Sequence, residues 1–291
     1  MLGQRTSPST PEVIRVRTED NVFQRLEVLK RNRNKRHRFG EFFLEGVRGI
    51  NAARAHGWGI LVLAYAADRR LSAWAQMVLT EQKTATHLEL SPYLMEELSD
   101  REDSSELIAI VGIPDDDPDR IALGRAGAQA LVVIFDRPVS PGNLGSIIRS
   151  CDALGADGLI VTGHGADVYD PATVRASAGS LFALPTVRLA SHNEAGAWVD
   201  RVELDLGGTR PQIVGASGDG DFTIDEIDLT GATVLVIGNE TKGLSAGYRA
   251  VCNTLVRIPM AGAADSLNVA CAASIVLYEA ARQRQRRVPV G

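Results

Sequence analysis

Short, mostly apolar runs of strand length recur in the second half of the chain, and they limit its fold more than any other feature. They occupy residues 131–135, 158–161, 186–189, 213–216, 233–237 and 254–258. Strands that are apolar on both faces are typical of parallel sheets covered by helices. Segments with helical spacing lie between or after these runs, at residues 146–154, 193–199 and 266–282. We therefore predict an α/β domain with a mostly parallel sheet over residues 129–291.

A second, smaller α/β pattern precedes this domain. Helical spacing begins at Val22, and strand-like and helical segments follow at residues 41–46, 49–55, 60–65, 71–78, 92–98 and 107–111. This pattern predicts a separate α/β domain over residues 21–113. Residues 1–20 mix Pro, Ser, Thr and charged residues without periodicity, which predicts a flexible tail. The Pro- and Asp-rich segment at residues 114–128 predicts a linker.

Composition excludes several classes of protein. No apolar run approaches the roughly 18 residues needed to cross a bilayer, and residues 1–20 hold charges instead of an apolar signal core. The 3 cysteines form no C-x-x-C pair, and no two of the 5 histidines lie four residues apart. We therefore expect a cytoplasmic protein without a disulfide framework, a bound metal or a membrane span.

Basic residues are concentrated near the start of the chain, although the net charge is −5. Residues 1–50 hold 11 Lys and Arg against 6 Asp and Glu, whereas the rest of the chain holds 20 against 30. The basic cluster consists of Lys30, Arg31, Arg33, Lys35, Arg36 and Arg38. Such a cluster either binds the phosphates of a nucleic acid, in a salt-dependent way, or forms a solvated loop. Charge alone does not decide between these interpretations.

Three loops that follow predicted strands hold most of the chemically useful side chains. In open α/β sheets, ligands bind beyond the carboxyl ends of the strands. The first loop, residues 136–149, contains Asn143 and leads to Arg149, one turn inside a helix that we expect Ser146 to open. It lacks the glycine spacing of a dinucleotide site and the Gly-Lys-Ser/Thr of a phosphate loop. The alternative interpretation makes its glycines turn residues and Arg149 a surface cation.

The other two loops add an acid and two polar residues. In the second, residues 236–245, Gly238 would let a ligand approach the backbone closely, and Glu240 lies near a helix start. The third, residues 258–270, leads into the last predicted helix. There Ser266 is a candidate N-cap, and Asn268 lies in the first turn, where propensity does not favour it. Asn268 is therefore expected to have a polar partner.

Together these loops resemble the signature motifs of the SpoU, or TrmH, family of RNA methyltransferases within the SPOUT superfamily. The first motif is present as Asn143, Gly145 and Arg149. The second is present as Gly238-Asn239-Glu240 with Gly243, and the third as Ile258-Pro259-Met260 followed by Ser266-Leu267-Asn268. One departure is that many members have Asn or Asp where this chain has Ser140.

Two further resemblances concern the substrate. Residues 22–111 resemble the L30e-like RNA-binding domain that often precedes this catalytic domain. Three segments, at residues 32–36, 135–138 and 168–171, are similar to those of family members that methylate a ribose of 23S rRNA and confer avilamycin resistance. The resemblance implies methylation of a ribose 2′-hydroxyl of RNA, with a 23S rRNA uridine as the expected target and antibiotic resistance as a further expectation.

The resemblance also assigns roles to individual residues. It implies that S-adenosylmethionine binds at Gly238, Asn239, Ile258, Met260 and Leu267. It implies catalysis by Arg149 with the support of Asn143, Glu240, Ser266 and Asn268, and RNA contacts by Arg33, Lys35, Arg36, Arg38 and Arg175. It further implies a homodimer and a deep trefoil knot, in which the chain from about residue 235 onward threads through an earlier loop.

Arg149 is expected to act as a charged donor and not as a base. Deprotonating an arginine at neutral pH costs roughly 8 kcal/mol, because its pKa lies about six units above neutrality. A charged guanidinium can instead stabilise the alkoxide that develops on the ribose. Glu240 is the natural charge partner for this arginine.

The sequence leaves alternatives open. A tRNA ribose methyltransferase would share the same motifs, and a non-catalytic RNA-binding protein would share the fold, although the intact motif residues argue against it. A dinucleotide-dependent oxidoreductase is disfavoured because the acidic ribose partner of such enzymes is missing. The Ser266-x-Asn268 motif favours ribose over a base as the methyl acceptor.

Overall fold

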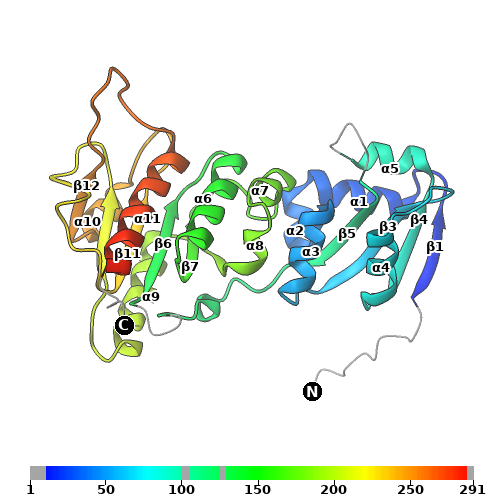
Figure 1. Ribbon diagram of the computed structural model, residues 1–291, viewed down its shortest axis with the longest axis horizontal. Helices are drawn as coiled ribbons and strands as arrows, with labels where there is room; N and C mark the ends of the chain where they lie inside the picture. Colours follow the sequence, from blue (N-terminus) through cyan, green and yellow to red (C-terminus); the bar gives the residue numbers. More distant parts are fainter. Residues whose placement is uncertain (1–10, 100–104, 125–128, 287–291) are drawn as a thin grey trace. The chain divides into compact units, whose positions relative to one another are not determined.

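The computed structural model describes residues 11–99, 105–124 and 129–286 (Figure 1). Contacts divide the chain into two compact units. The N-terminal unit comprises the residues up to Pro114 together with Tyr169–Arg175, and the C-terminal unit comprises Asp115–Val168 and the residues from Ala176 onward. Within the described ranges, no helix combines the length and apolar character that a bilayer crossing requires.

The N-terminal unit is built on a five-stranded mixed sheet in the order β1-β4-β3-β5-β2. Its strands are β1 (Glu12–Val16), β2 (Glu41–Glu45), β3 (Ile60–Ala66), β4 (Thr86–Leu90) and β5 (Leu107–Gly112). Strands β1, β4 and β3 run parallel, and β5 is antiparallel to both β3 and β2. The helices are α1 (Asn21–Arg31), α2 (Arg33–Phe39), α3 (Val47–Ala55), α4 (Ala73–Glu81) and α5 (Pro92–Leu98). The predicted α/β fold of this half is confirmed.

Residues 11–20 do not form the predicted flexible tail. Strand β1 pairs in parallel with β4, and its Val16 is fully buried in the core of the unit, where Ile14 also packs. The prediction missed this strand because charged Glu12 and Arg15 interrupt a short apolar pattern. Mixed polar and apolar residues are nevertheless typical of an edge strand that buries one face. Residues 1–10 lie outside the described ranges.

The C-terminal unit is built on a seven-stranded sheet in the order β10-β12-β9-β11-β6-β7-β8, in which every pairing is parallel. Its strands are β6 (Leu131–Asp136), β7 (Gly158–Thr162), β8 (Thr186–Leu189), β9 (Gln212–Ala216), β10 (Phe222–Thr223), β11 (Thr233–Ile237) and β12 (Thr254–Arg257). The helices of this half of the chain are α6 (Pro141–Ala153), α7 (Pro171–Ala176), α8 (Ser180–Ala183), α9 (His192–Asp205), α10 (Ala246–Val251) and α11 (Val269–Arg286). All predicted strands are present, so the parallel-sheet prediction is confirmed.

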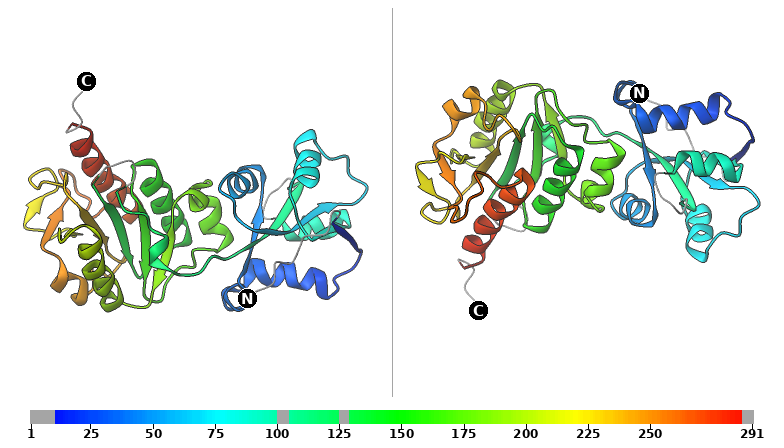
Figure 2. Two further views of the ribbon diagram at one scale, coloured as in Figure 1. Left: turned by 90° about the horizontal axis from the view of Figure 1, so that it is seen from below. Right: turned by 90° about the horizontal axis from the view of Figure 1, so that it is seen from above.

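Helices cover both faces of this sheet. Figure 2 shows α6 and α11 side by side on one face, with α9 and α10 on the other. Trp198 of α9 and Tyr248 of α10 are buried against the strands. The hydroxyls of Ser150 on α6 and Ser274 on α11 are 2.8 Å apart and form a hydrogen bond between these two helices.

Residues 115–124 are not the free linker that the sequence predicts. Ile121 is buried in the core of the C-terminal unit. Asp116 forms an ion pair with Arg188 of β8, and Asp157 accepts a hydrogen bond from the N–H of Gly124 at 3.0 Å. Three of the aspartates that indicated a linker, Asp116, Asp117 and Asp119, are instead partners of arginines and backbone groups. Residues 125–128 lie outside the described ranges.

Candidate active site and cofactor pocket

Four strands of the C-terminal sheet end at one edge and bring their loops together. Strands β12, β9, β11 and β6 are consecutive neighbours and run parallel, so their carboxyl ends meet. The loops that follow β6, β11 and β12 are the three that the sequence singles out. Ligands of open α/β sheets bind at this edge.

The loop after β6 ends where α6 begins, at Pro141 and not at Ser146 as predicted. Ser140 is the N-cap, because its Oγ accepts a hydrogen bond from the N–H of Asn143 at 3.3 Å. Serine at the N-cap and proline in the first helical turn are both preferred. Ser140 therefore serves as the N-cap of α6.

Glu240, from the loop after β11, binds the N-terminus of α6. Its Oε2 accepts a hydrogen bond from the N–H of Val139 at 2.8 Å. Its Oε1 accepts hydrogen bonds from the N–H of Ser140 at 2.9 Å and from Nδ2 of Asn143 at 3.3 Å. A carboxylate is favourable there because the first N–H groups of a helix have no partner within it. The prediction of an arginine partner for Glu240 is therefore wrong, since backbone N–H groups and an amide fill that role.

Asn143 links Glu240 to the loop after β12. Its Oδ1 accepts a hydrogen bond from Nδ2 of Asn268 at 3.1 Å. The Oδ1 of Asn268 accepts hydrogen bonds from the N–H groups of Ala270 at 2.8 Å and Cys271 at 3.4 Å. Asn268 therefore caps α11 and is not inside its first turn, which corrects the predicted helix start. Asn143 is the polar partner that the sequence led us to expect.

The loop after β11 is closed by its own residues. A Cβ at Gly238 would lie 2.4 Å from the carbonyl carbon of Gly243, so closure of this loop requires glycine at position 238. The Asn239 side chain accepts hydrogen bonds from the N–H groups of Thr241 and Lys242 at 3.0 Å. Its Nδ2 donates to the carbonyl of Arg137 at 2.6 Å. The Asn239 amide is thus committed to holding this loop beside β6.

Arg137 joins the same two loops. Its guanidinium donates to both carboxylate oxygens of Asp136, at 3.0 and 2.9 Å, and to the carbonyl of Gly243 at 3.3 Å. The hydrogen bond to Asp136 raises the pKa of Arg137 above its ordinary value. Asp136 also accepts a hydrogen bond from the N–H of Ser245 at 3.1 Å. The position of Glu240 is therefore fixed from both sides of its loop.

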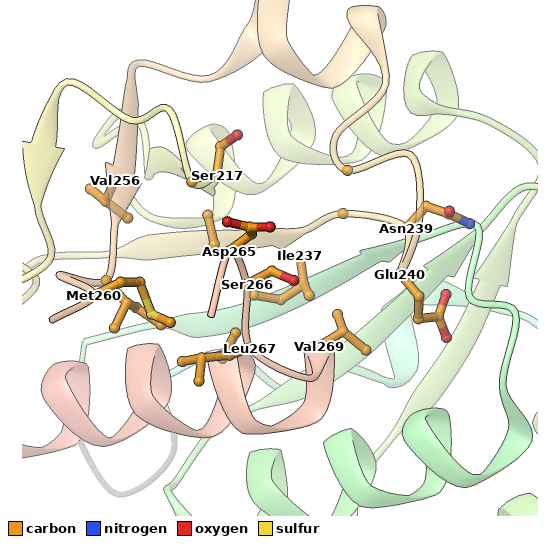
Figure 3. Close-up of a pocket in the computed structure, with 16 residues that line it drawn as sticks. Ser217, Ile237, Asn239, Glu240, Val256, Met260, Asp265, Ser266, Leu267 and Val269 are labelled. Atoms are coloured by element: carbon orange, nitrogen blue, oxygen red, sulfur yellow. The ribbon is translucent and has the colours of Figure 1, made fainter. Parts of the chain in front are cut away.

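A pocket lies beside the network of Asn143, Glu240 and Asn268 (Figure 3). All five residues predicted to bind the cofactor line it, and so do two predicted catalytic residues: Gly238, Asn239, Ile258, Met260, Leu267, Glu240 and Ser266. The pocket is also lined by Ala216–Gly218 and Asp265, which the sequence did not single out as site residues. The first of these segments follows a predicted strand, so the rule that places ligands at strand ends could have found it.

Arg149 lies apart from this network. It is exposed on α6 and has no hydrogen bond or ion pair with any residue in the described ranges. Six residues separate it from Asn143, which corresponds to about 9 Å along a helix axis. The structure therefore brings Asn143, Glu240 and Asn268 together and leaves the Arg149 guanidinium open to a ligand.

Comparisons with known proteins agree with these motifs. Residues 130–278 match the SpoU rRNA Methylase family, and residues 20–109 match the SpoU L30e-like domain. A 23S rRNA (uridine(2479)-2′-O)-methyltransferase of Streptomyces viridochromogenes is 48% identical over 284 residues, which cover 97% of each chain. This chain belongs to the SpoU rRNA methylase family. The family resemblance inferred from the three loops is confirmed.

Solved structures of SpoU methyltransferases share the fold. The SpoU methyltransferase AviRb from Streptomyces viridochromogenes, in complex with the cofactor AdoMet, superimposes with a TM-score of 0.86 at 49% identity, covering 91% of this chain and 98% of that one. An AdoMet-bound rRNA methyltransferase from Sinorhizobium meliloti gives a TM-score of 0.79 at 30% identity, covering 93% and 98%.

The basic cluster of this SpoU methylase lies on helices and not in a loop. Asn32 separates α1 from α2 and caps α2, because its Oδ1 accepts a hydrogen bond from the N–H of Lys35 at 3.1 Å. Arg33 and Lys35 are half-buried, and Arg38 is exposed. The structure thus presents parts of this cluster to solvent from one short helix.

The prediction that Arg36 contacts RNA is wrong. Its side chain is buried, and its Nη1 donates to the carbonyls of Leu29 and Lys30, each at 3.0 Å. Its Nη2 donates to the carboxylate of Asp170 at 3.4 Å. A buried and paired guanidinium holds α1 and α2 together and cannot reach a phosphate.

Arg175, the remaining predicted RNA contact, lies among the residues grouped with the N-terminal unit. Its side chain is half-exposed and lies 3.8 Å from the carboxylate of Glu45. Arg175 therefore remains accessible, with part of its charge already offset.

Proposed function

We propose that this protein transfers a methyl group from S-adenosylmethionine to a ribose 2′-hydroxyl of 23S rRNA. The observation that supports this most directly is the pocket, which is lined by the second and third SpoU motifs and adjoins Asn143 of the first. A relative that matches 97% of this chain is named as a 23S rRNA uridine 2′-O-methyltransferase. A uridine is therefore the proposed target.

The residues of the pocket fit S-adenosylmethionine. This cofactor supplies an electrophilic methyl group on a cationic sulfonium, and it also has an adenine ring and an ammonium group. Ile237, Val256 and Leu267 give the pocket apolar walls that suit the ring. Asp265 adds a carboxylate that has no hydrogen bond to any described residue and that suits a cation. The trefoil knot expected of the family from about residue 235 onward is part of this proposal.

Arg149 is proposed to stabilise the alkoxide as the charged donor described above. The amide of Asn143 and the Glu240 carboxylate hold the start of α6, the helix that presents Arg149. Ser266 and Asn268 are proposed to orient the ribose from the adjoining loop. These residues bind and position the substrate, and the proton of the 2′-hydroxyl leaves to solvent or to a base outside this set.

Arg149→Ala tests this assignment. We expect methyl transfer to fall at least about 100-fold, as when one donor to a developing oxyanion is removed, with S-adenosylmethionine affinity in calorimetry nearly unchanged. Arg149→Lys keeps the charge and is expected to recover part of the rate. Retained turnover in Arg149→Ala would refute the role.

The RNA target is tested by mapping 2′-O-methyl groups in rRNA and tRNA from cells with and without the gene. We expect one uridine of 23S rRNA to lose its methyl group when the gene is absent. A change in tRNA alone would support the tRNA alternative, and a protein that fails to bind S-adenosylmethionine would support the non-catalytic alternative. Avilamycin resistance, measured in the same cells, and a cytoplasmic location are further parts of the proposal.

We also propose a homodimer formed through α11. Cys271, Ile275 and Tyr278 are exposed and share one face of this helix, with Ile275 at 39% and Tyr278 at 59% exposure. Sedimentation is expected to give the mass of two chains, and Tyr278→Asp is expected to give one. In the dimer, the Cys271 thiol should react more slowly with a thiol reagent than in this variant.

A further inference from the structure

An exposed aromatic ring lies within the basic cluster of the N-terminal unit. Phe39 is the last residue of α2 and is 42% exposed. The guanidinium carbon of Arg25 lies 5.4 Å from the centre of its ring, and Nζ of Lys35 lies 5.9 Å from it. Residues 21–40 hold seven Lys and Arg and a single Glu, so the ring is surrounded by positive charge.

The cations around Phe39 differ in whether they are already neutralised. Arg25 donates to both carboxylate oxygens of Glu41, at 2.8 and 2.7 Å. Neither Lys35 nor Arg38 has a carboxylate partner among the residues that the structure describes. The charge of Lys35 at the ring and the exposed charge of Arg38, the residue before Phe39 on α2, are therefore available to an anionic ligand. Cation–π contacts at exposed sites are weak enough for Lys35 to move onto such a ligand.

Exposed aromatic side chains of the N-terminal unit are not always surrounded by positive charge, as Tyr93 shows. It is 57% exposed on α5 of the same unit. Its hydroxyl donates to Glu19 at 3.4 Å, and the nearby carboxylates of Glu97 and Glu19 raise its pKa. A phosphate chain would be repelled at Tyr93 and attracted at Phe39.

We propose that Phe39 is a stacking platform for one unpaired base of the RNA substrate, with Lys35 and Arg38 binding the phosphates on either side. Aromatic side chains stack on bases that are splayed out of a helix, whereas the bases of a duplex are covered by their neighbours. The N-terminal unit therefore recognises a loop, bulge or single-stranded end of the RNA substrate. This inference rests on the proposed function, because it takes RNA to be the substrate.

The test measures binding of the full chain to a short single-stranded RNA of mixed sequence and to an RNA duplex of equal length. For Phe39→Ala we expect single-strand affinity to fall about 5- to 100-fold, with duplex affinity nearly unchanged. The dependence of log affinity on log salt should keep its slope in this variant, because no phosphate contact is lost. In Lys35→Ala the slope should fall by about 0.7.

Two further variants separate stacking from damage to the surface. Phe39→Trp should bind the single strand at least as well as the wild type, and Tyr93→Ala should bind as the wild type does. The proposal is overturned if Phe39→Ala binds the single strand normally, if it loses duplex affinity equally, or if Phe39→Trp fails to restore binding. None of these results affects the role of Arg149, so methyl transfer by the wild type tests the proposed function separately.

Discussion

Replacing Glu240 with glutamine tests whether one carboxylate assembles the site. In the native site, the two carboxylate oxygens accept hydrogen bonds from the N–H groups of Val139 and Ser140 and from the Asn143 amide. A glutamine oxygen can replace only one carboxylate oxygen. Its amide nitrogen would then face an N–H donor, whichever way the amide is turned.

The expected loss follows from these contacts. An N–H left without an acceptor in a partly buried site costs about 1–3 kcal/mol, and removing the charge from a helix N-terminus costs about 0.3–1 kcal/mol more. We therefore expect Glu240→Gln to lower the free energy of unfolding by about 1.5–4 kcal/mol in urea denaturation. Methyl transfer should also fall, because the Asn143 amide is no longer held in one orientation.

Asp152→Asn is the matched control. Asp152 lies near the C-terminal end of the same helix and has no hydrogen bond from its side chain among the described residues. Removing a negative charge at that end is expected to leave stability unchanged or to raise it by a few tenths of a kcal/mol. If Glu240→Gln and Asp152→Asn both unfold within about 0.5 kcal/mol of the wild type, the carboxylate does not hold the site together.

Asn268→Ala should cost about 0.5–2 kcal/mol of stability in denaturant titration, because it uncaps α11. Asn268→Ser should restore stability but not methyl transfer, since serine caps the helix but does not replace the amide that donates to Asn143. Equal recovery of stability and methyl transfer in Asn268→Ser would contradict this prediction. Gly238→Ala should destabilise the C-terminal unit by about 1–3 kcal/mol, because the new Cβ meets the Gly243 backbone. Calorimetry should show that cofactor binding is lost. Normal cofactor binding would contradict this prediction, because it would mean that the loop adapts to the alanine. Burial lowers the pKa of His87, and its buried Nε2 has no hydrogen-bond partner among the described residues. Near pH 6.5 the unfolded chain therefore binds a proton more readily than the folded chain does. Stability should therefore fall as pH drops below about 6.5, with a slope of at most about 1.4 kcal/mol per pH unit, and His87→Leu should flatten the dependence of the melting temperature on pH.

Six of the seven strands of the C-terminal unit could be predicted because each is a mostly apolar run, whereas the two-residue strand β10 is too short to form one. Strand β4 of the N-terminal unit could not be predicted, because His87 and Glu89 alternate with its buried leucines and interrupt the apolar pattern. Helix α2 was missed for a related reason, since six of its seven residues are polar or charged and show no apolar face. Its position depends on the burial of Arg36, which pairs with distant Asp170 and leaves no local signal.

The candidate site was predictable as a set of loops but not as a network. Asn143 and Asn268 are 125 residues apart, and nothing local indicates that their amides meet. The start of α6 could have been predicted from the sequence, because Ser140 followed by Pro141 is typical of an N-cap and first turn. The partners of Glu240 could not be predicted, because they include backbone N–H groups whose direction depends on where α6 begins.

The network of Asn143, Glu240 and Asn268 also has a consequence for the synthesis of this protein, because its members come from distant parts of the chain. The last of these residues lies shortly before α11, so most of the chain must leave the ribosome before the three side chains can meet. A shorter nascent chain that lacks Asn268 cannot form the joined loops, so we expect no methyl transfer from it.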